Sequence, residues 1–320
     1  MPYDATQLPN GPNADRGFSP LSLSSSLLQR TLRGPAECSG IGVHSGEKVN
    51  LRLLPAPENT GIVFVRTDLL NGARKIPARW DHVVETQLCT VIGNSHGARV
   101  VTIEHLMAAL RAYEIDNAII EIDGAEVPVM DGSSDSFVFL IEMAGIITQN
   151  APRRAIEIIR PVEASHDGKF ARLAPADEAR FSFEITFDRK PIATQSYDFT
   201  LSPESFKSEL SRARTFGFFE EVDQLQKQGF ARGGSLHNAI VIKDDAVLNE
   251  GGLRYADEFV RHKVLDAVGD LALAGAPVLG HFHGHCSGHA LNNKLLRALF
   301  ADPLAWREVE AEPMAEMALA

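Results

Sequence analysis

Residues 257–266 read Asp257-Glu-Phe-Val-Arg-His-Lys-Val-Leu-Asp266, and this stretch is the most informative in the chain. Its pattern is helical, so His262 and Asp266, four residues apart, share one face of the helix. An imidazole and a carboxylate on one face can bind one divalent metal ion. A second fragment, Thr102-Ile-Glu-His105, can complete the set of ligands. Two imidazoles, one carboxylate and an open fourth position are typical of a catalytic zinc site rather than a structural one.

The composition is that of a soluble globular protein large enough for two domains. The chain has 320 residues, of which 44% are hydrophobic and 23% are charged. Its net charge of -11 argues against non-specific nucleic-acid binding, which needs a basic surface. Three scattered cysteines, Cys38, Cys89 and Cys286, indicate a reducing compartment and no disulfide framework.

We expect a cytoplasmic protein. No run of the sequence approaches the roughly 18 to 20 apolar residues that a membrane helix needs. The N-terminus begins Met-Pro-Tyr-Asp and lacks the basic segment of a secretory signal. We also expect a monomer that binds a small-molecule substrate and no nucleic acid.

Four segments are expected along the chain. Residues 1–27 are rich in Pro, Asn, Asp, Gly and Ser and predict a flexible N-terminal extension. Domain I is expected at 28–150 and domain II at 151–306, because the short polar stretch at 150–154 contains a proline and is typical of a boundary. Residues 307–320 are expected to form a C-terminal tail. Runs of strands followed by helices in both halves indicate the α+β class and two domains of similar design.

Apolar periodicity and capping residues predict the individual elements. Thr102 is expected to cap the helix that carries His105. The strands are expected at 49–54, 61–66, 117–123, 155–159, 171–174, 181–187, 239–243 and 278–285. The helices are expected at 102–113, 136–141, 202–210, 219–228, 257–274 and 290–300.

Glu104 and His105 can divide two tasks between them. Adjacent helical positions point about 100° apart, so both cannot ligate one metal ion equally well. His105 is therefore the natural ligand, and Glu104 can act as a general base on a bound water. The alternative is a surface glutamate followed by a capping histidine. For His262 and Asp266 the alternative is a hydrogen-bonded pair on a helix face.

Three further fragments could take part in chemistry. His289 follows a glycine at the start of a helical stretch, where it could act as a general acid or oxyanion partner at a cleft rim. The run Ser211-Arg-Ala-Arg-Thr-Phe-Gly-Phe suits an anionic, ring-bearing ligand, with Thr215 as an oxyanion donor. The alternating histidines 281, 283 and 285 share one face of a strand. They could hold a second metal ion, but we favour a polar strand face that takes up zinc only adventitiously.

Taken together, these fragments resemble one family over about residues 29–305. Its motifs occur here in order as Ser39-Gly-Ile-Gly-Val-His-Ser-Gly46, Ile103-Glu-His-Leu-Met-Ala-Ala-Leu, Glu126-Val-Pro-Val-Met-Asp-Gly-Ser, Ser211-Arg-Ala-Arg-Thr-Phe-Gly, the extended 257–271 stretch and Ser287-Gly-His-Ala-Leu-Asn-Asn-Lys. The chain resembles the UDP-3-O-acyl-N-acetylglucosamine deacetylases, the zinc amidases of lipid A synthesis in Gram-negative bacteria. The resemblance implies removal of the N-acetyl group from the acylated sugar nucleotide, the committed step of that pathway.

The resemblance also implies the catalytic roles. One Zn²⁺ per chain, with Fe²⁺ as an alternative in the same site, is held by His105, His262 and Asp266. Glu104 is the general base on the zinc-bound water. His289 and Thr215 meet the developing oxyanion. Whether Glu104 or His289 protonates the leaving amine stays open at this stage.

The substrate contacts implied by the resemblance surround these groups. They are Lys263 for the diphosphate, Phe216 for the sugar, Phe187 near the uridine, and Val43 and His44 beside the acyl chain. The implied fold has two similar domains of sheet and helices packed face to face, with the active site between them. A small βαβ element inserted in domain II, at about 221–242, forms the acyl passage.

Two rival interpretations remain open. One is a zinc amidohydrolase that acts on a different acylated substrate. The other is an idle binding protein that senses the sugar nucleotide, but such a protein predicts broken catalytic positions.

Overall fold

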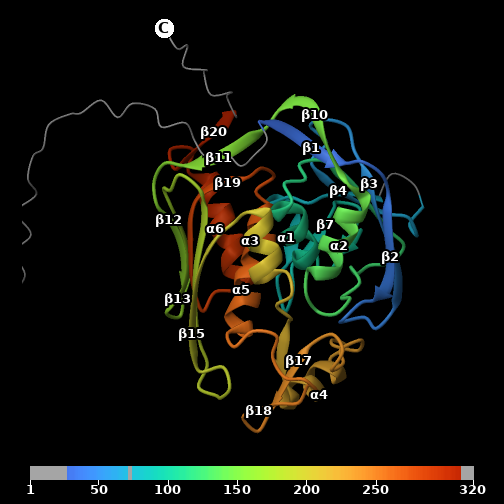
Figure 1. The fold of residues 1–320 in the computed structure, drawn as a ribbon, viewed down its shortest axis with the longest axis vertical. Coiled ribbons are helices and arrows are strands. Elements are labelled where there is room, and N and C mark those ends of the chain that lie inside the picture. Colours follow the sequence, from blue (N-terminus) through green and yellow to red (C-terminus); the bar gives the residue numbers. More distant parts are fainter. Residues whose placement is uncertain (1–26, 71–73, 311–320) are drawn as a thin grey trace, which may run out of the picture.

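The computed structural model describes residues 27–70 and 74–310, which form an α+β fold (Figure 1). The helices are α1 (Glu104–Ala112), α2 (Asp135–Ala144), α3 (Pro203–Ser205), α4 (Phe219–Lys227), α5 (Glu258–Ala272) and α6 (His289–Ala301), with short helical turns at Trp80–His82 and Phe206–Leu210. The first ten strands are β1 (Leu28–Leu32), β2 (Ala36–Ile41), β3 (Lys48–Pro55), β4 (Ile62–Arg66), β5 (Lys75–Pro77), β6 (Val83–Glu85), β7 (Val91–Gly93), β8 (Arg99–Val100), β9 (Ala118–Ile122) and β10 (Ile146–Pro152). The others are β11 (Arg154–Ile158), β12 (Val162–His166), β13 (Lys169–Ala174), β14 (Ala179–Thr186), β15 (Thr194–Thr200), β16 (Phe216–Phe218), β17 (Ile240–Lys243), β18 (Ala246–Val247), β19 (Val278–His285) and β20 (Trp306–Glu310).

Two large sheets lie on opposite sides of the molecule, with α1, α5 and α6 between them (Figure 1). The first has the order β2-β3-β9-β4-β5, and a small sheet of β6, β7 and β8 accompanies it. The second contains β12-β13-β19-β11-β20, and β14 joins it by pairing with both β19 and β15. Each sheet presents alternate side chains to the helices, as in β3, where Val49, Leu51 and Leu53 are buried. The α+β prediction of two units packed face to face is confirmed.

Helices α1 and α5 pack directly on each other at the centre. Both are buried on nearly all sides, including the polar residues Glu104, His105, His262 and Asp266. Gly269 permits this approach, because a Cβ atom there would lie 2.0 Å from the carbonyl oxygen of Glu104. The missing side chain therefore brings the first turn of α1 against the second half of α5.

The junction between the two halves is ordered and tightly held. The segment predicted as a boundary, 150–154, contains the end of β10 and the start of β11, with Arg153 alone between them. Strand β10 pairs antiparallel with β1. The side chain of Arg153 is 1% exposed and forms ion pairs with Asp116 at 2.8 Å and Glu114 at 3.2 Å. A buried guanidinium needs such partners, so these two carboxylates fix the chain where it passes from one half to the other.

One expectation about a helix end needs correction. Thr102 does not cap α1, since the cap position is Ile103 and Thr102 adopts a φ of 59°. Its hydroxyl donates instead to Glu126 Oε1 at 3.1 Å, a long-range partner that local sequence could not reveal. Strand β20 runs from Trp306 to Glu310 and pairs antiparallel with β11 along its length. Most of the expected N-terminal extension and C-terminal tail, at residues 1–26 and 311–320, lies outside the described residues.

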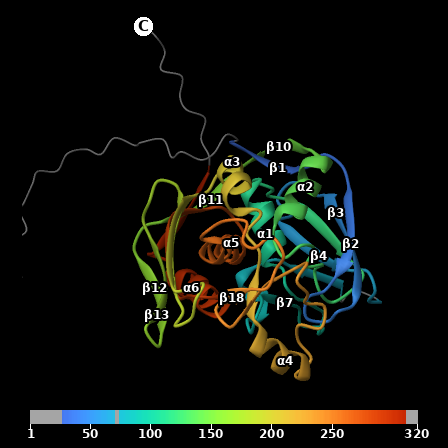
Figure 2. The ribbon, with the colours of Figure 1, turned by 60° about the horizontal axis from the view of Figure 1, so that its bottom comes forward.

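The expected insertion is present and is longer than predicted. Strands β16 and β17 are parallel and α4 connects them, which makes a βαβ unit over residues 216–243. Figure 2 shows α4 at the rim of the molecule, away from α1 and α5. Strand β18 adds an antiparallel edge. The unit projects from the body of the molecule. Within the described residues, no helix has the length and apolar character needed to cross a bilayer.

Gly269→Ala tests the central packing. The added methyl group would overlap a backbone atom of α1 and force the helices apart, so the free energy of unfolding should fall by about 1–3 kcal/mol. Gly217→Ala is the matched control, because a Cβ there meets nothing within 4 Å. Urea unfolding of both variants measures the difference. Equal stability of the two variants would show that the helix contact tolerates a methyl group and does not depend on Gly269.

Candidate metal centre and active site

Three buried side chains converge where α1 meets α5. The Asp266 Oδ1 atom lies 3.3 Å from His262 Nε2 and 3.6 Å from His105 Nε2. All three ligand atoms lie within 4.8 Å of one another. The two imidazole rings meet nearly perpendicularly, with centroids 4.9 Å apart. The structure thus brings together the three residues that the sequence selected as ligands.

The chemistry of this cluster fits a divalent metal ion. Asp266 Oδ1 is buried and has no hydrogen-bond partner among the described residues, which is costly unless a cation meets it. His262 donates its Nδ1 hydrogen to the carbonyl oxygen of Ala213 at 3.0 Å, which leaves Nε2 free to ligate. Burial lowers the pKa of His262 to about 3, so its imidazole is neutral, as a ligand must be.

A charge network holds Asp266 in its ionised form. Burial would raise the pKa of Asp266, but the interactions with the His262 imidazole and the Lys263 ammonium outweigh it and hold that pKa well below the usual range. Lys263 donates from Nζ to Asp266 Oδ2. Burial would lower the pKa of Lys263, and the carboxylate of Asp266 reverses this and raises it. The second carboxylate oxygen is therefore committed to Lys263, and only Oδ1 faces the imidazoles.

Glu104 lies beside this cluster and is almost completely buried. Its Oε2 atom accepts a hydrogen bond from the amide of Thr90 at 3.1 Å. Its Oε1 atom lies 3.9 Å from His289 Nε2. Burial raises the pKa of Glu104, against the opposing charges of His289 and His105. A carboxylate with a raised pKa next to a metal cluster is suited to accept a proton.

His289 begins α6 and is oriented by Asp270, a residue that the sequence analysis did not single out. The Nδ1 hydrogen of His289 is donated to Asp270 Oδ2 at 2.9 Å. Asp270 also accepts hydrogen bonds from the Thr90 hydroxyl and from Asn292 Nδ2. Burial would lower the pKa of His289, but Asp270 and Glu104 reverse this and raise it to about 9. The only sequence signal for Asp270 was its place one helical turn after Asp266.

The expected substrate residues cluster around His262. The Phe216 ring lies 6.4 Å from the His262 ring, 5.0 Å from Phe259 and 6.0 Å from Phe187, measured between centroids. Lys263 Nζ lies 5.9 Å above the Phe216 ring. Thr215 is fixed through its backbone, which donates to the Gly132 carbonyl oxygen at 2.8 Å. Phe216 therefore joins the rings of Phe187, Phe259 and His262 in one aromatic group beside the cluster.

The loop with Val43 and His44 packs against the βαβ insertion. The His44 amide donates to Glu126 Oε1 at 2.9 Å, and its ring meets the edge of Phe230 at 5.8 Å. The Val43 carbonyl accepts from Gly233, and a Cβ on Gly233 would lie 2.2 Å from the Gly42 carbonyl oxygen. Burial lowers the pKa of His44, although the Glu126 carboxylate opposes this shift. The loop therefore joins the insertion to the catalytic side.

The three histidines of β19 lie on the outer face of the second sheet. His281 Nε2 is 2.7 Å from the Ser182 hydroxyl, and His285 Nδ1 is 3.0 Å from Glu184 Oε1. The rings of His281 and His283 are parallel, with centroids 6.4 Å apart. Two of the three histidines thus have polar partners on the neighbouring strand β14, away from α1 and α5.

Comparison with known proteins gives one consistent result. The family model LpxC, described as UDP-3-O-acyl N-acetylglycosamine deacetylase, matches residues 29–301. A protein of Phenylobacterium zucineum named UDP-3-O-acyl-N-acetylglucosamine deacetylase is 50% identical over 291 residues, which cover 91% of this chain and 99% of that protein. Proteins of the same name from Oleidesulfovibrio alaskensis and Acidithiobacillus ferrooxidans are each 52% identical, over 85% and 89% of this chain and 89% and 93% of their own lengths. The match spans both halves and every residue of the buried cluster, so the chain belongs to the UDP-3-O-acyl N-acetylglycosamine deacetylase family.

Proposed function

We propose that this protein is a zinc-dependent hydrolase that removes the N-acetyl group from UDP-3-O-((3R)-3-hydroxyacyl)-N-acetylglucosamine. The products are the free amine and acetate, and the reaction is the committed step of lipid A biosynthesis. The observation that carries the proposal is the convergence of three ligand atoms within 4.8 Å, directly beside the Glu104 and His289 pair. Family membership supports the substrate class.

The metal ion in this proposal is Zn²⁺, one per chain. His105, His262 and Asp266 would hold it, and two nitrogens with one oxygen suit zinc, although Fe²⁺ could occupy the same ligands. When bound, the ion supplies a Lewis acid that polarises the amide carbonyl and lowers the pKa of water. The remaining tasks fall to the side chains around it.

Glu104 and His289 divide the proton transfers. The buried Glu104 takes a proton from the attacking water. His289, which Asp270 keeps positively charged at neutral pH, stabilises the negative charge that develops on the carbonyl oxygen. Thr215 assists at the same oxygen. We assign protonation of the leaving amine to His289, because it already carries a proton that it can give up.

The substrate is placed by the residues around this pair. Phe216 packs against the sugar, Phe187 lies towards the uridine, and Lys263 serves the diphosphate. Val43 and His44 border the acyl chain, which passes between their loop and the βαβ insertion. The contact between Gly233 and Gly42 supports this passage, since it fixes the two segments next to each other. We further propose domains at 28–150 and 151–306 and a cytoplasmic monomer.

The reaction and its metal can be tested on one sample. Purified protein should release acetate from the UDP-linked substrate, carry about one zinc per chain, lose activity on chelation and regain it with limiting zinc. Acetate assay and metal analysis measure both quantities. Bound zinc without acetate release would contradict the substrate and favour a different acylated amide.

Glu104→Gln and His262→Asn separate catalysis from metal binding. Loss of the general base should lower kcat by about 10²–10⁴-fold while the zinc content stays unchanged. Loss of a ligand should remove zinc and activity together. Metal analysis and steady-state kinetics on both variants give the result. Wild-type turnover in Glu104→Gln would exclude Glu104 as the base.

Asp270→Asn tests the charge on His289. The pKa of His289 is raised to about 9, so its proton is present below that pH and is lost as the pH rises through it. Without the Asp270 carboxylate this pKa falls, and the alkaline limb of the kcat profile should move to lower pH. The acid limb should stay in place. A reduced kcat with an unmoved alkaline limb would mean that Asp270 acts only through structure.

A further inference from the structure

A second pocket lies at the opposite ends of the two central helices. Its volume is about 360 Å³, within the range of small-molecule sites. The last turn of α1 lines it with Leu110 and Arg111, and the end of α5 lines it with Ala272. The metal ligands belong to the first turn of α1 and the first half of α5. Pro277 and Arg154 complete the wall from the second sheet, so both halves of the molecule contribute.

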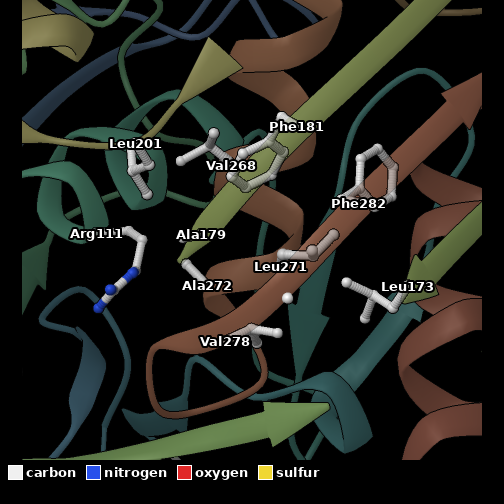
Figure 3. A pocket seen from close by; sticks show the side chains of 11 residues that line it. Arg111, Leu173, Ala179, Phe181, Leu201, Val268, Leu271, Ala272, Val278 and Phe282 are labelled. Carbon is white, nitrogen blue, oxygen red and sulfur yellow. The ribbon is translucent and has the colours of Figure 1, made fainter. Parts of the chain in front are cut away.

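Arg111 is the unusual residue of this pocket. Its guanidinium forms no hydrogen bond or ion pair within residues 27–70 and 74–310. Figure 3 shows it at the edge of a small neighbouring pocket, with its nitrogens turned away from the apolar side chains of Phe181 and Leu271. Burial, reinforced by Arg153, lowers the pKa of Arg111 to about 10, which leaves it charged at neutral pH. A half-buried guanidinium therefore offers several donors and a positive charge to the pocket.

The other charged groups that line the pocket already have partners. Arg79 is paired with Asp81 at 3.1 Å. Arg154 is paired with Glu308 at 3.3 Å. Asp116 accepts from Arg153 and from the backbone amide of Arg30. Each of these groups has a direct partner. The carboxylates of Asp116 and Glu114 also act on Arg111, but without a direct ion pair to it among the described residues.

The remaining wall combines polar and apolar residues. Met107 and Ile115 line it but are themselves buried, whereas Ile62, Ala272 and Ala276 are partly exposed. Water can hydrate the guanidinium in such a space, but it cannot neutralise its charge. An oxyanion can do so through paired, charge-assisted hydrogen bonds, and an apolar body can cover the adjoining side chains.

We propose that this pocket binds a small organic anion, with its oxyanion head on Arg111 and a short apolar body along the partly exposed Ile62 and Ala276. The occupant would contact both halves of the molecule at the ends of the helices that carry the metal ligands. This inference concerns a site separate from the deacetylase centre and does not depend on the reaction proposed for it.

Hexanoate is the probe for this site, added to the zinc-loaded full chain. The Met107 methyl group, labelled with carbon-13 and assigned with Met107→Leu, reports binding in the pocket by NMR, and calorimetry gives the dissociation constant. Arg111→Gln should weaken binding at least about tenfold, because the charge-assisted contacts are lost. Arg111→Lys keeps the charge and should recover part of the affinity. Arg79 lines the same pocket but is already paired with Asp81, so Arg79→Gln should change the affinity for hexanoate less than about twofold.

Two further ligands test the contributions of the charge and of the apolar body separately. Hexanol has the apolar body without the charge, and inorganic phosphate has the charge without the body, so both should bind more weakly than hexanoate. Hexanoate that binds only at the metal ligands would persist in Arg111→Gln and leave the Met107 signal unmoved. That result would overturn the proposal, as would an unshifted Met107 signal at about 20 mM hexanoate, well above a millimolar dissociation constant.

Discussion

The contact between the backbone of α1 at Glu104 and α5 at Gly269 is the constraint on which the centre of this protein depends. Two helices approach this closely only where one of them lacks a side chain. The contact places one metal ligand on α1 within reach of two on α5, so neither half can form the site alone. The same contact also places Glu104 next to His289, the first residue of α6. Catalytic geometry is therefore a consequence of helix packing, and the sheets on either side hold the helices in place.

Burying several charged side chains at one point is costly, and hydrogen bonds to Asp266 and Asp270 offset much of this cost. Asp266 gives one oxygen to Lys263 and keeps the other for the imidazoles. Asp270 is satisfied by Thr90, Asn292 and His289. The Asp266 Oδ1 atom is the exception in this cluster, being buried without a hydrogen bond among the described residues. A binding site for a cation requires such a buried oxygen without a hydrogen bond, held in place by neighbours whose hydrogen bonds are complete.

The sequence predicted the parts of this arrangement that follow a regular period. The α5 face with His262 and Asp266 and the strands with apolar alternation could be read directly, because both depend on local spacing. Asp270 was missed because its role depends on α6, which lies elsewhere in the sequence. Thr102 was misassigned because its hydroxyl serves Glu126 across the fold rather than the helix next to it. Strands of two or three residues, such as β5 to β8, carry too few residues to show a period.

Two arginines at the far end of α1 show how burial alone fails to identify a binding site. Arg153 is the more buried, yet Glu114 and Asp116 satisfy it, and its contribution is to the junction between β10 and β11. The charge of Arg153 helps to lower the pKa of Arg111, and Asp116 and Glu114 oppose this shift while being ion-paired with Arg153 themselves. The Arg111 side chain lines a pocket and has no direct ion pair among the described residues, so its role is better explained by a ligand than by packing.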